Sequence, residues 1–183
     1  MDHLTTISGK RINLFEMRPE DFDIQDIAHS LSMINRFNGH VTHPISVAQH
    51  SVFVSWLCDD TPFALQGLLH DGAEAYVGDV TKWLKETEAM AAYRKTEESI
   101  QRLLLTTFKC APELSSPVLR ADKLMVRYEA WRGGMIIHNP NYPEPNREER
   151  VQLEDLRWTF WDQQTAKDQF MNRFFELSLR STK

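Results

Sequence analysis

Apolar positions recur at spacings of three and four along much of the chain, which is the period of an α-helix with one buried face. In residues 18–37, RPEDFDIQDIAHSLSMINRF, four such positions are Ile24, Ile27, Leu31 and Ile34. Pro19 and acidic residues precede them, as is typical of a first helical turn, and Gly39 follows. The pattern predicts a helix that ends near Phe37.

Two more helices are expected between Pro44 and Gly78. The stretch HPISVAQHSVFVSWLCDD contains several valines, which are typical of strands, but its apolar positions also fit one helical face, so we favour a helix. The next stretch, TPFALQGLLHDGAEAYVGD, begins with Thr61 as a cap and Pro62 at the first helical position. We predict one continuous helix that closes at Gly78.

The rest of the chain continues the helical pattern, with one interruption. Long amphipathic segments over residues 86–108 and 116–133 predict two helices, the second with Ser116 as its cap. Residues 138–150, HNPNYPEPNREER, contain three prolines and predict a loop.

A final helix is predicted near residues 166–180, starting at a Thr165-x-x-Asp168 capping pattern. Its apolar side chains, Phe170, Phe174 and Leu177, are expected to be buried. With Phe175 they make this helix rich in aromatic residues, and we expect a homo-oligomer through it.

Composition predicts one domain over residues 1–183 and limits the classes of partner to be expected. The chain is 42% hydrophobic and 26% charged, with a net charge of −5. A basic excess is missing, which argues against a nucleic-acid polymer or an anionic membrane as partner. The two cysteines, Cys58 and Cys110, form no disulfide framework, and no signal peptide or membrane-spanning run stands out. We therefore expect a cytoplasmic protein with a small-molecule or protein partner.

Ionisable residues interrupt the apolar stretch LLHDGAEAYVGDV, residues 68–80. On a continuous helix, His70 and Asp71 occupy adjacent sectors and Glu74 returns to the same side. Burying such groups unpaired costs several kcal/mol, and a divalent cation would satisfy imidazole and carboxylate together. Further ligands are sought elsewhere: His50 in SVAQHS, and Asp122 in LRADKL, on an otherwise apolar face.

The combined pattern AQHS…LLHDGAEAYVGDV…RADKL resembles the HD-domain metal-dependent phosphohydrolases. The spacing from His-Asp through Glu to Gly-Asp, followed by Lys85, is similar to their small 5′-deoxynucleotidase branch. Residues 8–51 are similar to a phage and bacterial subgroup that includes the dATP triphosphohydrolase of diaminopurine-genome phages. The resemblance covers about residues 8–130, leaving a loop and the C-terminal helix in residues 133–183, and it implies an all-α, compact HD-domain helical bundle.

The resemblance also implies a role for each candidate residue. The metal would be held by His50, His70, Asp71 and Asp122. Glu74 and Asp79 match acidic positions that handle the attacking water or the leaving oxygen, and Arg36 and Lys85 match phosphate contacts. Arginine and a metal both offset phosphoryl charge, and the metal lowers the pKa of bound water. Phe37 and Trp83 could offer a flat surface to a base.

The expected substrate is a deoxynucleotide, and several alternatives stay open. We lean to dATP triphosphohydrolysis, with a 5′-deoxynucleotidase on monophosphates and a non-catalytic nucleotide-binding HD module as alternatives. A guanosine alarmone is disfavoured because Ala75 follows Glu74 where that branch usually has Asp. The ligand types do not choose among Mn, Co, Fe, Ni, Zn and Mg. Arg36 could instead pair with Glu20 or Asp26.

Overall fold

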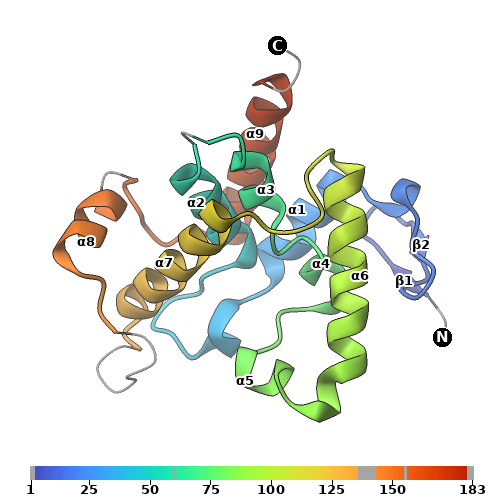
Figure 1. The fold of residues 1–183 in the computed structure, drawn as a ribbon, viewed down its shortest axis with the longest axis horizontal. Helices are drawn as coiled ribbons and strands as arrows, with labels where there is room; N and C mark the ends of the chain where they lie inside the picture. The colour runs from blue at the N-terminus through green and yellow to red at the C-terminus, as the bar shows by residue number, and fades with distance from the viewer. Residues whose placement is uncertain (1–2, 60, 136–142, 155, 181–183) are drawn as a thin grey trace.

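The computed structural model describes residues 3–59, 61–135, 143–154 and 156–180. Its fold is all-α, which confirms the predicted class (Figure 1). The only sheet in the described part of the chain is a hairpin of β1 (Leu4–Thr5) and β2 (Arg11–Ile12), which are antiparallel. The 3-10 turn η1 (Pro19–Asp21) leads from the hairpin to the first helix.

The first helix, α1 (Ile24–Met33), ends earlier than the sequence predicts. Beyond it the backbone pairs with the segment before the next helix, where Arg36 N donates to Ile45 O at 2.8 Å. This pairing draws the chain out of the helix and into the turn η2 (Arg36–Gly39), in which Phe37 has a left-handed φ of 57°. The predicted extension of the helix to Phe37 is therefore wrong, and Arg36 lies on a turn.

The central helix, α2 (Val47–Leu57), is buried at every residue from Val47 to Ser55. Four helices of the described chain pack around it: α1, α3 (Ala64–Leu69), α7 (Ser116–Arg132) and α9 (Gln163–Arg180). Gly67 of α3 lies so close to α2 that an added Cβ would stand 3.3 Å from Ser55 Cα. The helix that we favoured over a strand is confirmed, and its burial on all sides explains the weak apolar periodicity.

The continuous helix predicted over residues 61–78 is wrong, because the chain turns between α3 and α4 (Glu74–Val77). The side chain of Gln101, on the long helix α6 (Ala91–Thr107), holds that turn. Gln101 Oε1 accepts a hydrogen bond from Ala73 N at 2.9 Å, and its Nε2 donates to Leu69 O at 2.8 Å. The His-Asp motif therefore lies at a break between helices, where its side chains are not restricted to one helical face.

Helix N-termini differ from the predicted caps by a few residues. Thr61 accepts a hydrogen bond from Phe63 N at 3.2 Å but precedes the first residue of α3. Ser115, rather than Ser116, is the N-cap of α7. α9 begins before Thr165, whose backbone N donates to Asp162 Oδ1 at 2.7 Å, so the predicted capping residue lies inside the helix.

The helix predicted over residues 86–108 begins later than expected, at Ala91. A short helix, α5 (Lys82–Lys85), and the 3-10 turn η3 (Glu88–Met90) precede α6. Figure 1 shows α5 at one end of α6, so this part of the chain runs out from the bundle and returns along α6. The amphipathic pattern predicted the helical content of the segment but missed these bends.

The last of the short helices, α8 (Arg147–Glu154), begins inside the stretch predicted as a loop. Residues 138–142 of that stretch lie outside the described residues. Asn146 Oδ1 accepts a hydrogen bond from Glu149 N at 3.0 Å, and Glu149 Oε2 accepts one from Asn146 N at 2.8 Å. This reciprocal cap, readable as Asn-x-x-Glu, starts a helix where the prolines end.

The remaining predictions concern surfaces and thiols. In the part of the chain that the structure describes, no helix is both long and apolar enough to span a membrane. Cys58 and Cys110 are free thiols. On α9, Phe170 is buried, Phe174 is partly buried and Phe175 is 55% exposed. An oligomer formed through this helix stays a prediction.

Candidate metal centre

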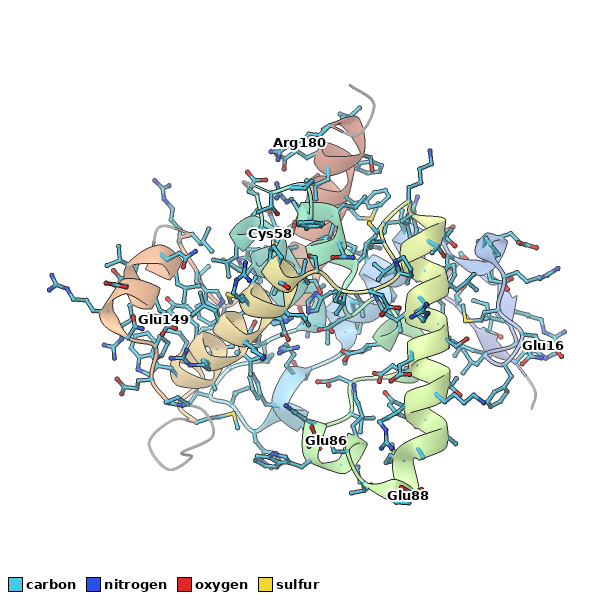
Figure 2. The ribbon with its side chains drawn as sticks, in the orientation of Figure 1. Glu16, Cys58, Glu86, Glu88, Glu149 and Arg180 are labelled. Atoms are coloured by element: carbon cyan, nitrogen blue, oxygen red, sulfur yellow. The ribbon has the colours of Figure 1, made fainter. Side chains whose placement is uncertain are left out.

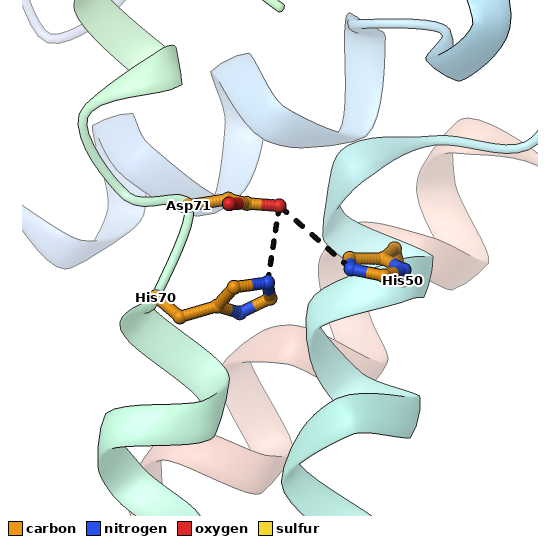
Figure 3. Close-up of side chains that lie close together, drawn as sticks. All are labelled: His50, His70 and Asp71. Carbon is orange, nitrogen blue, oxygen red and sulfur yellow. Dashed lines mark ion pairs between the residues drawn. The ribbon is translucent and has the colours of Figure 1, made fainter. Parts of the chain in front are cut away.

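Three predicted metal ligands converge where α2 meets the break after α3 (Figure 3). His50 is a buried residue of α2, His70 directly follows α3, and Asp71 lies in the turn. Asp71 Oδ2 lies 3.2 Å from His70 Nε2 and 3.8 Å from His50 Nε2. The break in the helix lets the carboxylate point across to α2, which a continuous helix would not.

The fourth predicted ligand, Asp122, reaches the same point from α7. Its Oδ1 lies 3.2 Å from His50 Nε2 and 3.9 Å from His70 Nε2. Ligand atoms bound about 2.1 Å from one cation stand roughly 3.0–3.4 Å apart. The ligand atoms of His50, His70 and Asp71 all lie within 4.8 Å of one another, and Asp122 lies next to both imidazoles from a third part of the chain.

The hydrogen bonds of the two imidazoles favour metal binding. His70 Nδ1 lies 2.8 Å from Gly67 O, so it carries the proton that it donates to this carbonyl. His50 Nδ1 lies 3.1 Å from each carboxylate oxygen of Glu129. A cation that displaced the hydrogen bond between His50 Nε2 and Asp122 Oδ1 would meet a lone pair on both Nε2 atoms. His70 Nε2 is buried and makes no hydrogen bond to any described residue, and a cation would satisfy it.

The charges of the cluster also suit a cation. In the metal-free protein, burial lowers the pKa of His50, but Glu129 and a hydrogen bond with Asp122 outweigh this and raise it to about 9. Burial alone would raise the pKa of Asp71, yet both imidazoles and Arg36 hold it below its ordinary value. The carboxylates thus stay ionised and attract positive charge to the point where the Nε2 atoms meet.

Glu74 lies beside the cluster at the start of α4 and is 6% exposed. Its Oε1 is 4.0 Å from Lys85 Nζ, and its buried Oε2 makes no hydrogen bond within the described residues. Burial and the nearby carboxylates of Asp71 and Asp79 raise the pKa of Glu74 well above its usual value. The pKa of Asp79 is raised too, chiefly by burial. Carboxyls in such settings are suited to proton transfer.

Arg36 is buried on the other side of the cluster, where η2 begins. Its Nε donates to Glu129 Oε2 at 3.0 Å, and its Nη1 lies 3.6 Å from Asp71 Oδ2. Burial lowers its pKa, but these carboxylates more than compensate. The alternative pairing with Glu20 or Asp26 is therefore wrong, and the arginine belongs to the candidate centre.

The other predicted contacts are more loosely placed. Lys85 Nζ donates to Glu97 Oε1 at 2.7 Å, an ion pair that the sequence analysis missed. Phe37 lies under the guanidinium of Arg36, with Arg36 Cζ 5.5 Å from its ring centre. Trp83 is 57% exposed. Neither aromatic ring lines the cleft beside the cluster, so their role as a base platform stays a prediction.

A cleft of about 460 Å³ opens beside the cluster. His70, Asp71, Glu74 and Lys85 form its inner wall. Its outer wall comes from α6 and the loop before α7, and is lined by Glu97, Glu98, Gln101, Arg102, Pro112, Glu113 and Leu114. Ligand sites for small molecules usually measure about 300–1,000 Å³, so the volume suits a nucleotide.

Two further residues, which were not predicted from the sequence, hold this site together, one fully buried and one partly buried. Glu129 is fully buried between Arg36 and His50, and Gln101 fixes the turn that carries His70 and Asp71. Glu129 had a readable signal, because it stands seven residues after Asp122, two turns along the same face of a helix. Gln101 had none, because a glutamine on an amphipathic helix is ordinarily a surface residue.

Comparison with known proteins identifies relatives. No family model matches the chain. The uncharacterized protein YfdR of Escherichia coli (strain K12) is 39% identical over 129 residues, which span 70% of this chain and 71% of YfdR. This chain belongs to the same family as YfdR. An uncharacterized protein of Rhodobacter capsulatus is 32% identical over 136 residues, 68% of this chain and 69% of that protein. The names of these two relatives state no activity.

Proposed function

We propose that this protein is an HD-domain metal-dependent phosphohydrolase that acts on the 5′-phosphate end of deoxynucleotides. The observation that carries the proposal is the convergence of two imidazole Nε2 atoms and two carboxylates beside a buried glutamate and a buried arginine. A purely structural metal site needs neither Glu74 nor Arg36. Their presence favours an enzyme over a non-catalytic nucleotide-binding module.

Each side chain has a distinct task in this proposal. His50, His70, Asp71 and Asp122 would hold a divalent cation, which supplies a more acidic bound water and offsets phosphoryl charge. Glu74, whose pKa is raised by burial, accepts or returns a proton during hydrolysis. Arg36 binds a phosphoryl oxygen through its Nη edge, because its Nε is engaged by Glu129. Lys85 contacts a second phosphate after leaving Glu97.

The finer proposal is dATP triphosphohydrolysis, which rests on the resemblance of residues 8–51 to the phage and bacterial subgroup. The cleft volume of about 460 Å³ suits a nucleotide but does not select the number of phosphates. Hydrolysis of deoxynucleoside monophosphates is the alternative within the same chemistry. The cation is Mn, Co, Fe, Ni, Zn or Mg, since imidazole and carboxylate ligands accept all of these.

Product analysis tests the proposal. The purified protein is incubated with dATP, dAMP and the other deoxynucleotides, with each candidate metal in turn. Release of intact triphosphate from dATP would establish triphosphohydrolysis, and orthophosphate from monophosphates alone would establish a 5′-nucleotidase. An Asp71→Asn variant serves as the inactive control, and a variant of the exposed His3, His3→Ala, as the active one. No product with any metal, despite a bound ion, would contradict the proposal and favour a non-catalytic module.

A further inference from the structure

Glu129 is the most deeply buried carboxylate of the candidate centre, with an exposed fraction of zero. It lies on α7 and does not line the cleft. Its two carboxylate oxygens lie 3.1 Å from His50 Nδ1, and Oε2 also accepts a hydrogen bond from Arg36 Nε at 3.0 Å. A single carboxylate therefore contacts both a candidate metal ligand and a candidate phosphate ligand.

We infer that Glu129 is a positioning residue that couples metal binding at His50 to phosphate binding at Arg36. The effect on metal binding follows from the geometry of His50 alone. The effect on phosphate binding rests on the proposed function, because it takes Arg36 as a contact of the substrate. Glu129 itself touches neither metal nor substrate, and acts only through these two side chains.

At His50, Glu129 selects the tautomer. By accepting a hydrogen bond from Nδ1, it holds a proton there, so that Nε2, which faces Asp122 and Asp71, is the nitrogen that would give its lone pair to a bound cation. An ionised acceptor also makes the imidazole a stronger ligand. His70 differs, because its Nδ1 donates to the neutral carbonyl of Gly67. His50 is thus the histidine whose affinity for the metal depends on a charged neighbour.

At Arg36, Glu129 keeps the guanidinium away from the metal ligands. Arg36 Nη1 lies 3.6 Å from Asp71 Oδ2, whereas Arg36 Nε lies 3.0 Å from Glu129 Oε2. Without Glu129 as its nearer anion, the guanidinium would close onto Asp71 and compete with the cation for that carboxylate. The pairing of Arg36 Nε with Glu129 also directs the Nη edge of Arg36 toward the site where a phosphoryl oxygen would bind.

The first experiment measures metal affinity without any substrate. Co²⁺ is titrated into the metal-free full-length protein and followed by its visible absorption, for wild type and Glu129→Gln. The amide keeps the size of the side chain but not its charge, and we expect Co²⁺ affinity to fall about 10- to 100-fold. The matched control is Glu149→Gln on α8, which removes a bidentate partner of Arg127 outside the centre (Figure 2). Unchanged Co²⁺ affinity in Glu129→Gln would overturn the inference.

The second experiment tests the coupling through Arg36. Binding of inorganic phosphate to the Co²⁺-saturated protein is measured for wild type, Glu129→Gln, Arg36→Gln and the double variant. If Glu129 acts through Arg36, each single change weakens phosphate binding and the double variant is no weaker than Arg36→Gln. If the two losses of phosphate affinity multiplied in the double variant, Glu129 would not act through Arg36, and the inferred coupling to phosphate binding would be overturned. Phosphate binding that Arg36→Gln leaves unchanged would instead contradict the role of Arg36 in the proposed function.

A third measurement uses the wild-type protein and does not depend on the variants folding. Nitrogen-15 NMR of the histidine rings reports which ring nitrogen carries the proton in the Zn²⁺-bound state. We expect a proton on Nδ1 of His50, with a downfield shift that reflects a charged acceptor, and a smaller shift for His70. A proton on Nε2 of His50 in the Zn²⁺-bound protein would overturn the inference.

Discussion

Two regions of this molecule bury charge in opposite ways. On α9, Arg173 is 4% exposed and every nitrogen of its guanidinium has a protein partner. Those partners are Ser55, Glu176 and Asp59. In the candidate metal centre, His70 Nε2 and Glu74 Oε2 are just as buried but make no hydrogen bond among the described residues.

This difference separates a structural polar network from a candidate site. Burying a polar group without a partner costs free energy, so an arrangement that satisfies every group stabilises the fold by itself. An arrangement that leaves groups unsatisfied around one point costs free energy that a bound ligand can offset. Costs of this kind are typical of functional sites. The comparison therefore predicts opposite consequences for mutations in the two regions.

The largest expected effect is loss of the proposed metal site. His70→Ala should abolish metal binding and nucleotide hydrolysis, because it removes one of the proposed metal ligands. In wild type, a chelator should lower the melting temperature, since a ligand at one hundred times its Kd stabilises by about 2.7 kcal/mol. His3→Ala is the control and should behave as wild type. Full hydrolysis by metal-free wild type would contradict the metal-dependent mechanism.

Glu74→Gln should affect turnover but not stability. We expect turnover to fall about 100-fold, the usual value for a positioned acid or base, with metal content unchanged. The melting temperature should stay equal or rise, because the pKa of this carboxyl is raised by burial and by neighbouring carboxylates. Glu98→Gln, on the exposed wall of the same cleft, is the control. An unchanged rate in Glu74→Gln would remove this residue from the mechanism.

Arg173→Met should give the opposite result in the other region. Loss of its hydrogen bonds to Ser55 and Asp59 should reduce the free energy of unfolding by about 2 kcal/mol. Metal affinity should not change. The control is Arg180→Met, because Arg180 also contacts Asp59 but is half exposed, and its loss should reduce the free energy of unfolding much less. Urea unfolding measures both variants, and equal losses would contradict the distinction between buried and exposed arginine.

The smallest expected effect concerns the turn that carries the motif. Gln101→Leu removes two hydrogen bonds to the backbone around His70 and Asp71, and should cost about 1 kcal/mol and weaken Co²⁺ binding several-fold. Gln66 makes similar hydrogen bonds to the backbone at Ala111 and Ser115, away from the ligands. Gln66→Leu should therefore lose similar stability and keep its Co²⁺ affinity. Equal Co²⁺ affinities in the two variants would show that the turn tolerates the loss.

The helices were predictable where a local signal specifies them. Apolar spacing predicted α1, α6, α7 and α9, and even the ligand positions could be proposed from residue types. The break in the helix at the His-Asp motif had only a weak local signal, Gly72, because a single glycine is often tolerated inside a helix. Gln101, distant in sequence, interrupts the helix by competing for the backbone hydrogen bonds at Leu69 and Ala73. Helix propensity is a weak preference that such tertiary contacts override.

The sequence by itself determined the all-α class and the presence of His, Asp and Glu in unusual positions, because periodicity and residue chemistry are local properties. Only the tertiary structure decided that His50, His70, Asp71 and Asp122 meet, and that Glu129 lies behind them. Their meeting depends on how α2, α7 and the break after α3 pack against one another. The free energy of that packing comes from the whole buried core, so no single segment of the sequence encodes it.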